Sequence, residues 1–428
     1  MRKVKIVGIG LGDESMCTLG AREALAGCDA IAGGARLLDA AESIAGGDAS
    51  PARVEEISPK AIRVAFDAMD FDTACVVCSG DTGFYSLAST IRGALGGYEV
   101  ETIPGIATVQ YMAAKLGRPW QGCTLRSAHG KDCNILGEVL SSPEVFFLTG
   151  GDIVPKTIAQ VLDDAGLGDV EMSVGERLSY PDERVVTDRA AAFVGVDFDS
   201  LSAVWTRRGD LRSPELEGYP CLTCGIPDEA FARGKVPMTK QEVRAVSMAK
   251  LQVSPGDVVY DIGAGTGSVS IEAALASPMC RVYSIEVNPE GCALIEENRR
   301  RFGAYNVSVV EGPAPEAMDG LPAPDVAFIG GSKGNMEAIV GRLLELNPAC
   351  RIVATAVTME TVEEAQRIFS EMALQSRLDG FEVAEVSVNR TREVGRYHML
   401  SAQNPIFIFS ARGSLQGEQP GGDEAGPR

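Results

Sequence analysis

The fold of the second half of the chain is decided by the stretch Val258-Val-Tyr-Asp261-Ile-Gly263-Ala-Gly265-Thr-Gly267-Ser268. Residues that favour β-structure lead into an aspartate and a glycine-rich turn, and the segment 269–275 follows with the composition of a helix. A strand, a tight glycine turn and a helix start together form the corner at which α/β domains bind nucleotides. The glycines let the backbone approach a ligand closely, and the helix start presents free N–H groups. The stretch therefore predicts a nucleotide-binding corner.

The spacing within this motif separates two classes of cofactor. Gly267 follows Gly263 by four residues, one fewer than in the dinucleotide fingerprint, and Asp261 precedes the first glycine by two. This D-x-G-x-G-x-G form resembles class I S-adenosylmethionine (SAM) methyltransferases. A second strand at 281–285 leads to Glu286, an acid that can accept from both ribose hydroxyls of an adenosyl ligand. SAM is the expected cofactor, and NAD or a glycine turn without a ligand are the alternatives.

Bulk composition limits the class of protein and its partners. A length of 428 residues predicts two or three domains, and 45% hydrophobic with 23% charged residues is typical of globular proteins. A net charge of −20 argues against a nucleic-acid partner, because phosphate contacts need basic surface. No apolar run reaches the length of a membrane span, and the acids Asp13 and Glu14 favour a first strand over a signal peptide. We expect neither a nucleic-acid nor a membrane partner.

The cysteines indicate a reducing compartment. There are 11, an odd number, and they are scattered through both halves, so we expect free thiols in the cytoplasm. Two Cys-x-x-Cys pairs, Cys75/Cys78 and Cys221/Cys224, lie too far apart in sequence to form one zinc ribbon. Inert thiols are therefore favoured over zinc, and no metal site is expected.

Strands alternate with helices in both halves, and strands of the first half end in Gly or Pro, which predicts α/β sheets with ligand loops on one edge. We place the first domain at 1–208 and the second at 238–412. The segment 209–237 lacks periodicity and is interpreted as a linker, and 413–428 is interpreted as a disordered tail.

Two local features of the second domain are also predicted. Thr239, with Glu242 three residues later, is a plausible N-cap for a helix through Leu251. The segments 381–388 and 405–409 are expected to pair as an antiparallel hairpin at the sheet edge.

Further segments of the second half resemble the precorrin-type C15 methyltransferase and decarboxylase of cobalamin (vitamin B12) biosynthesis. The resemblance is carried by Gly234-Lys-Val-Pro-Met-Thr-Lys240-Gln-Glu-Val-Arg244, the glycine motif, Pro324-Asp-Val-Ala-Phe-Ile-Gly-Gly-Ser332, Thr355-Ala-Val-Thr358 and Gly395-Arg-Tyr-His-Met-Leu400. The Val-Pro-Met-Thr-Lys and Gly-Gly-Ser segments are the narrower signals, since the glycine loop is common to methyltransferases.

The first half resembles the tetrapyrrole methylases, a separate SAM-dependent fold. Its matching segments are Gly8-x-Gly10-x-Gly12-Asp13, Ser79-Gly-Asp81, Ile103-Pro-Gly105-Ile-Ala-Thr-Val-Gln110, Ser127-x-His129-Gly130 and Tyr180-Pro-Asp-Glu-Arg184. Both halves in one chain resemble the precorrin-6Y C5,15-methyltransferase (decarboxylating) family, over roughly residues 1–412.

The resemblance implies an α/β protein in which a tetrapyrrole-methylase fold of two α/β subdomains precedes a Rossmann-like class I SAM methyltransferase. The first half would methylate C5 of a precorrin. The second would methylate C15 and remove CO2 from the acetate at C12. The resemblance also suggests a homo-oligomer.

Cofactor-binding residues follow from the same resemblance. In the second half they are Thr239, Gly263, Ala264, Gly265, Thr266, Gly267, Glu286 and Ala314. In the first half they are Gly80, Asp81, Gly83, Phe84, Thr108, Leu148 and Thr149. Two positions depart from the family pattern: Pro313 replaces an acid that can meet the adenine amino group, and Thr82 replaces a proline.

Substrate contacts are predicted from charge. A precorrin carries many carboxylates, so an acidic protein needs local cations around it. The candidates in the second half are Lys240, Arg244, Lys333, Arg390, Arg392, Arg396 and His398. Asp13 in the first half is a further candidate. A solvated surface charge is the alternative for each cation, and a structural role is the alternative for His129 and His398.

No catalytic residue is assigned. A meso carbon of a reduced tetrapyrrole is made nucleophilic by its enamine nitrogens, so methyl transfer needs no dedicated base. Three alternatives remain at this point: a methyltransferase for RNA or another small molecule, a non-catalytic tetrapyrrole-binding scaffold in one half, and a nicotinamide oxidoreductase. The sequence leaves open whether the substrate carries cobalt, the order of the methylations, channelling between the halves and the oligomeric state.

Overall fold

The computed structural model describes residues 2–46, 51–128, 133–209 and 224–415. Two compact units divide the chain, one of residues 1–135 and 142–208 and the other of residues 136–141 and 209–428. Within the described ranges, no helix is both long and apolar enough to cross a membrane.

A five-stranded parallel sheet opens the first unit, in the order β3-β2-β4-β1-β5. Its strands are β1 (Lys3–Gly8), β2 (Ala30–Gly33), β3 (Ala52–Glu55), β4 (Thr73–Cys78) and β5 (Glu99–Ile103). Alternate residues of β4 enter two separate cores, because a parallel sheet is covered on both faces. Helices α1 (Leu19–Ala26) and α2 (Ala35–Ala45) contribute to one core, and α3 (Pro59–Asp67) and α4 (Ala88–Ala94) to the other.

A second five-stranded sheet completes the unit, in the order β6-β7-β10-β8-β9. Its strands are β6 (Thr124–Ser127), β7 (Glu144–Leu148), β8 (Glu171–Glu176), β9 (Arg184–Arg189) and β10 (Ser202–Arg207), and the accompanying helices are α5 (Thr108–Leu116) and α7 (Pro155–Asp164). Helix α6 (Ile135–Ser141), apart from its first residue, belongs to the second unit. Strand β10 lies antiparallel between β7 and β8, so this sheet is mixed. The prediction of two α/β subdomains is confirmed.

The second unit is built on a seven-stranded sheet, in the order β13-β12-β11-β14-β15-β19-β16. Its strands are β11 (Val258–Ile262), β12 (Arg281–Glu286), β13 (Val307–Glu311), β14 (Val326–Ile329), β15 (Arg351–Ala356), β16 (Leu378–Val386) and β19 (Ile406–Gly413). The first five in the order are parallel, and β19 is antiparallel to both of its neighbours. The order reverses beside β11, and in open α/β sheets such a switch point is where ligands bind.

Helices among the described residues cover this sheet on two faces. One core contains apolar residues of α8 (Gln241–Leu251), α9 (Ser268–Ala276) and α10 (Pro289–Phe302). The other contains those of α11 (Met336–Leu346) and α12 (Met359–Leu374). The Rossmann-like fold predicted for this half is therefore confirmed.

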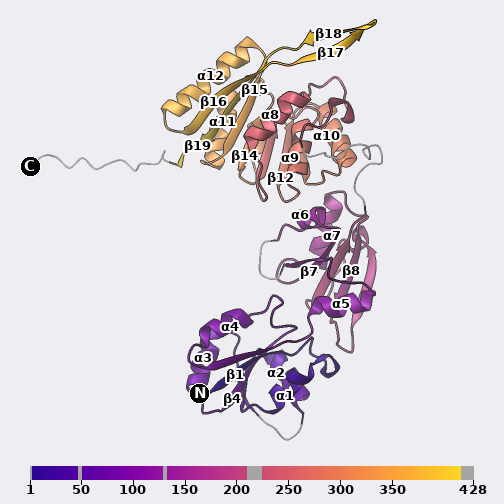
Figure 1. Ribbon diagram of the computed structural model, residues 1–428, viewed down its shortest axis with the longest axis vertical. Coiled ribbons are helices and arrows are strands. Elements are labelled where there is room, and N and C mark those ends of the chain that lie inside the picture. Colours follow the sequence, from indigo (N-terminus) through magenta and orange to yellow (C-terminus); the bar gives the residue numbers. More distant parts are fainter. Residues whose placement is uncertain (1, 47–50, 129–132, 210–223, 416–428) are drawn as a thin grey trace, which may run out of the picture. The chain divides into compact units, whose positions relative to one another are not determined.

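The predicted antiparallel pairing at the sheet edge is present between β16 and β19. Between them in sequence the chain forms a two-stranded arm, β17 (Asn389–Val394) and β18 (Tyr397–Ala402), which was not predicted. The arm projects away from the sheet of its own unit (Figure 1). Every residue of β18 is exposed, so the burial alternation that identifies most strands is missing here.

The segment predicted as a linker differs from the structure in its described part. Residues 224–237 pack onto the second unit, with a 3-10 helix at Asp228–Ala230 and with Ile226 and Phe231 in its core. The buried apolar residues of this segment are spaced irregularly, so its sequence lacks the periodicity of a helix or strand and resembles a linker. We call residues 225–240 the strap.

The predicted helix cap also needs correction. Helix α8 begins at Gln241, and Thr239 does not cap it; Asp228 Oδ1 instead accepts from Gln241 N at 2.9 Å. Strand β19 runs to Gly413 and Ser414 is buried, so the packed chain extends past residue 412. The rest of the predicted tail, from residue 416, lies outside the described residues.

Candidate functional site

The glycine motif of the second unit forms a close-packed corner between β11 and α9. Gly263 has a φ of +69°, and a Cβ added there would lie 2.6 Å from Gly331 O in the loop after β14. Gly265 has a φ of +58°, and a Cβ there would lie 2.3 Å from Pro237 O in the strap. Any side chain at these positions would collide with backbone on either side. The loop is therefore held between the strap and the loop after β14.

Only part of the motif is open to a ligand. Gly263 is exposed and Ala264 is half-buried, whereas Gly265, Thr266 and Gly267 are buried. Thr266 Oγ1 is buried and has no hydrogen-bond partner in the described part of the chain. The surface of the corner that a ligand can reach is therefore mainly backbone, and the buried residues of the motif pack beneath it.

Glu286 lies directly against this corner. Its side chain is buried, and Oε2 accepts from Gly265 N at 2.7 Å while Oε1 accepts from Asn288 N at 2.8 Å. The acid predicted from the end of β12 is therefore placed beside the glycines. Its two hydrogen bonds also give it a structural role, which the sequence did not predict.

Asp261 supports the corner from within the sheet. It is 1% exposed, and Oδ2 accepts from Ser270 N at 2.9 Å and from the Ser270 hydroxyl. Burial raises the pKa of Asp261 to about 6, and the two hydrogen bonds from Ser270 oppose the rise. Its position away from solvent argues for a role in holding α9 to β11.

Thr239 and Ala314, two further predicted cofactor residues, lie on neighbouring segments. Thr239 is half-buried in the strap, and its carbonyl is 3.4 Å from Ser268 Oγ at the start of α9. Ala314 is half-buried after β13, whose end is tied to β12 by the Gly312 N to Glu286 O hydrogen bond of 3.0 Å.

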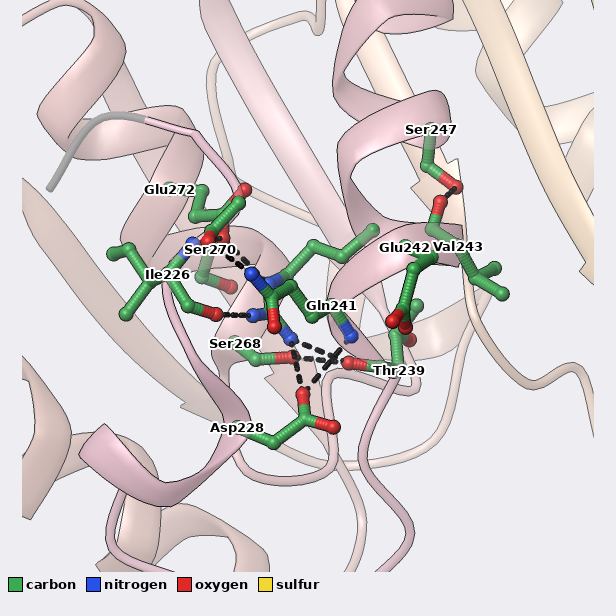
Figure 2. Close-up of polar contacts among 12 residues, drawn as sticks. Ile226, Asp228, Thr239, Gln241, Glu242, Val243, Ser247, Ser268, Ser270 and Glu272 are labelled. Atoms are coloured by element: carbon green, nitrogen blue, oxygen red, sulfur yellow. Dashed lines mark hydrogen bonds and ion pairs between the residues drawn. The ribbon is translucent and has the colours of Figure 1, made fainter. Parts of the chain in front are cut away.

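Arg244 is not a substrate-facing cation. Its side chain is 0% exposed, and its guanidinium donates to Glu272 Oε1 at 2.6 Å, to Thr239 O at 2.6 Å, to Ile226 O and, at 3.4 Å, to Asp228 Oδ1. Figure 2 shows these carboxylates and carbonyls converging on one point. The prediction for Arg244 is wrong because its partners lie in the strap and α9, which the sequence did not place beside it.

Arg390 extends this network to the arm. It forms a bidentate pair with Glu242 (3.0 and 2.6 Å) and lies 3.4 Å from Asp228 Oδ2. Its hydrogen bond lowers the pKa of Glu242 below its ordinary value. Arg390 therefore joins the base of β17 to α8 and to the strap.

The other predicted cations are scattered. Arg392 and Arg396 are exposed on the arm, where Arg396 lies over the Tyr397 ring. His398, also on the arm, is 3.7 Å from Glu393 Oε1. Lys240 is half-buried at the N-cap position of α8.

Lys333 differs from these cations, because it lines a cavity. A pocket of about 260 Å³ lies at the carboxyl ends of β14 and β15. Hydroxyls of Ser332, Thr355 and Thr358 share its wall with Lys333, and Glu364 faces it as well. A small polar substituent of a ligand matches this lining better than an apolar one.

The first unit contains a larger cavity, of about 730 Å³. Five of the seven cofactor residues predicted for this half line it, namely Gly80, Phe84, Thr108, Leu148 and Thr149. The loop after β4, the end of β7 with the residue that follows it, and the start of α5 supply them, so segments far apart in sequence meet at one cavity.

Asp81 and Gly83 are not in the wall of this cavity. Asp81 accepts from Gly83 N at 2.8 Å and from Gly105 N at 3.1 Å, so its carboxylate ties two of the loops together. Asp13 also lies outside the cavity wall and caps a 3-10 helix (Glu14–Met16), where hydrogen bonds from Ser15 lower its pKa. His129 lies outside the described residues.

Arg36, Arg177 and Tyr180 are among the polar residues of the cavity wall that were not predicted. Tyr180 belongs to the Tyr-Pro-Asp-Glu-Arg segment that matches the tetrapyrrole methylases, so a signal existed without an assigned role. Arg36 has no such motif around it.

Comparison with known proteins covers both halves. Residues 3–193 match the family described as Tetrapyrrole (Corrin/Porphyrin) Methylases, and residues 229–412 match the Precorrin methyltransferase domain. A precorrin-6Y C(5,15)-methyltransferase [decarboxylating] from Sinorhizobium sp. is 33% identical over 358 residues, which are 82% of this chain and 84% of the relative.

The chain belongs to the precorrin-6Y C5,15-methyltransferase (decarboxylating) family. Other relatives match less than half of the chain. A probable cobalt-precorrin-6B C(15)-methyltransferase (decarboxylating) from Pyrobaculum calidifontis is 40% identical over 45% of the chain and 98% of the relative. The crystal structure of a precorrin-6y C5,15-methyltransferase from Geobacter metallireducens is 40% identical, with a TM-score of 0.41, over 46% of this chain and 98% of the other.

Proposed function

We propose that the chain methylates a precorrin at C5 with its first unit and at C15 with its second, and removes CO2 from the C12 acetate. The observation that carries this proposal is the family relationship across both halves, together with a ligand-type cavity or corner in each unit. Neither half alone would account for two methylations.

The corner of the second unit fits SAM by the chemistry of its residues. Gly263 and Ala264 offer accessible backbone, and each Glu286 oxygen that accepts a backbone N–H keeps a second lone pair for a ribose hydroxyl. When bound, SAM supplies the methyl group and the sulfonium leaving group. The protein's part is to align the acceptor carbon and to exclude water.

The cavity of the first unit supports a second SAM site. Its volume of about 730 Å³ is within the range of cofactor pockets, and five of the seven predicted residues line it. Asp81 serves this site indirectly, because its two backbone hydrogen bonds fix the loops that carry Gly80 and Gly105.

The precorrin carboxylates need cations in each unit. In the second unit Lys333 is the best-supported contact, since it lines a cavity beside hydroxyl groups at the carboxyl edge of the sheet. A carboxylate there would meet one charge-assisted donor and several hydroxyl donors. We assign no residue to the decarboxylation step.

Self-association and a cytoplasmic location complete the proposal. The arm supports self-association, because Leu400, Tyr397 and Met399 are 70%, 60% and 49% exposed on β18, which pairs with β17. An apolar surface of this kind is typical of a protein contact.

Product mass tests the reaction. The purified chain would be incubated with SAM and a precorrin-6-level tetrapyrrole, metal-free or loaded with cobalt. We expect a product that has gained two methyl groups and lost one CO2, and the substrate form that reacts would identify the natural one. Methylation of neither form, in a protein that binds SAM, would contradict the proposal and favour another methyl acceptor.

A further inference from the structure

Charged side chains are sparse in the wall of the first unit's cavity. Only Arg36, Glu56 and Arg177 contribute charge among the described residues that line it. Two of them are arginines, in a protein whose net charge is −20. Both contact Tyr180.

Tyr180 is held in place from three sides. Arg36 Nη1 donates to its hydroxyl oxygen, and the Arg177 guanidinium lies over its ring, 5.2 Å from the centroid. The third contact is Gly12, where an added Cβ would lie 2.7 Å from Tyr180 Oη. The glycine loop after β1 therefore has a use other than phosphate or cofactor binding: it leaves room for this ring.

The two arginines differ in their charge partners. Arg177 Nε lies 2.6 Å from Asp182 Oδ2 and Arg177 Nη1 lies 3.7 Å from Asp199 Oδ2, so its charge is offset within the protein. Within the described ranges, Arg36 has no carboxylate at ion-pair distance, and its one hydrogen bond is to the neutral Tyr180. Arg36 is exposed and lines the cavity.

We propose that Arg36 and Tyr180 bind one carboxylate side chain of the macrocycle in the first unit and so orient C5 toward the cofactor. This inference rests on the proposed function. An arginine donates two parallel N–H groups to a carboxylate, and Tyr180, which accepts from Arg36, keeps its own O–H to donate to the same group. Arg177 acts as a positioning residue, because it holds the tyrosine ring rather than the ligand.

The test compares Arg36→Met, Arg36→Lys and Tyr180→Phe with the control Arg189→Met. Arg189 is an exposed arginine on β9 that pairs with Asp169 and does not line the cavity. For C5 methylation we expect Arg36→Met to raise KM for the tetrapyrrole about ten- to a hundredfold, the usual effect of removing a hydrogen bond to a charged group. Arg36→Lys should recover part of the loss, and Tyr180→Phe should cost less than Arg36→Met.

Three readouts separate this role from a structural one. KM for SAM should stay at the wild-type value, as should C15 methylation measured with a tetrapyrrole already methylated at C5. Direct titration with uroporphyrin, an octacarboxylate macrocycle, should show weaker binding to Arg36→Met and unchanged binding to Arg189→Met.

An unchanged tetrapyrrole KM in Arg36→Met, or an equal rise in KM for SAM, would overturn the assignment. If the wild-type chain methylates nothing at C5, the proposed function fails. The uroporphyrin titration still decides whether Arg36 binds carboxylates in that case, because it requires no turnover.

Discussion

Substitution of Glu286 tests the cofactor proposal for the second unit most directly. Replacement by Gln leaves one oxygen where two now accept from Gly265 N and Asn288 N. Because hydrogen bonds to charged groups contribute about 1.5–3 kcal/mol, we expect SAM affinity at this site to fall about ten- to a hundredfold. Isothermal titration with Glu286→Gln measures the change. Glu297→Gln, on the exposed part of α10, is the matched control, and equal affinities in the two variants would contradict the assignment.

Asp261 predicts a pH dependence of stability. Its pKa in the folded protein, about 6, lies above the ordinary value of 3.8, so the folded state binds the proton more tightly than the unfolded state. Stabilisation from this group is therefore complete below about pH 4 and is lost as the pH rises through about 6.

The variant Asp261→Asn isolates this effect, because Asn keeps an acceptor for Ser270 and cannot ionise. Since each pKa unit corresponds to about 1.4 kcal/mol, the wild type should lose about 3 kcal/mol relative to the variant between about pH 4 and pH 7. Denaturant unfolding of both proteins across this range measures it. A stability difference that stays constant with pH would rule the explanation out.

At the scale of elements, the strap depends on Arg244. This one guanidinium binds two strap carbonyls, of Ile226 and Thr239, and two carboxylates, of Asp228 and Glu272. Removal leaves the buried Glu272 without a counter-charge, which costs about 3–5 kcal/mol in comparable cases, whereas Asp228 keeps its contact with Arg390. Arg244→Met should therefore destabilise the second unit and weaken SAM binding there.

Differential scanning calorimetry of the full chain tests this expectation. The transition of the second unit should move to lower temperature in Arg244→Met and that of the first should not. The double variant Arg244→Met/Glu272→Met should recover stability, because it removes a buried acid together with its partner. A first-unit transition that shifts equally would argue against the assignment.

The arm makes a separate prediction. Changing Tyr397, Met399 and Leu400 together to Ser removes its exposed apolar side chains without touching the sheet. We expect sedimentation equilibrium to give a lower mass than for the wild type, with helical content unchanged. Three exposed apolar residues of helices, Leu19, Met359 and Leu374, changed in the same way serve as control. A wild-type protein that sediments as a monomer would refute the self-association proposal.

The sequence predicts local features of this protein better than contacts between distant segments, and the reason is physical. The sheets, the glycine corner and the position of Glu286 follow from local periodicity and spacing, and the structure reproduces them. Arg244, the strap and the arm depend on which distant segments meet. A charge such as Arg244 looks the same in sequence whether it faces solvent or Glu272. Arg36 was missed for the same reason, since its partner Tyr180 lies 144 residues away.

At the scale of the whole molecule, the central claim is a division of labour between two units that each hold a cofactor. Such a division predicts that damage to one corner leaves the other reaction intact. Gly265 is the position for the test, because a side chain there collides with Pro237 O and must adopt a positive φ. Gly341→Ala is the control, since an added Cβ there meets nothing within 4 Å.

The most direct measurement is the position of the new methyl groups in the product, read by NMR after incubation with SAM labelled with 13C in its methyl group. For the wild type and Gly341→Ala we expect label at C5 and C15 and a C12 methyl left by loss of CO2. Gly265→Val should give label at C5 alone and retain the C12 acetate. Label at C15, or loss of CO2, in the Gly265→Val product would contradict the account.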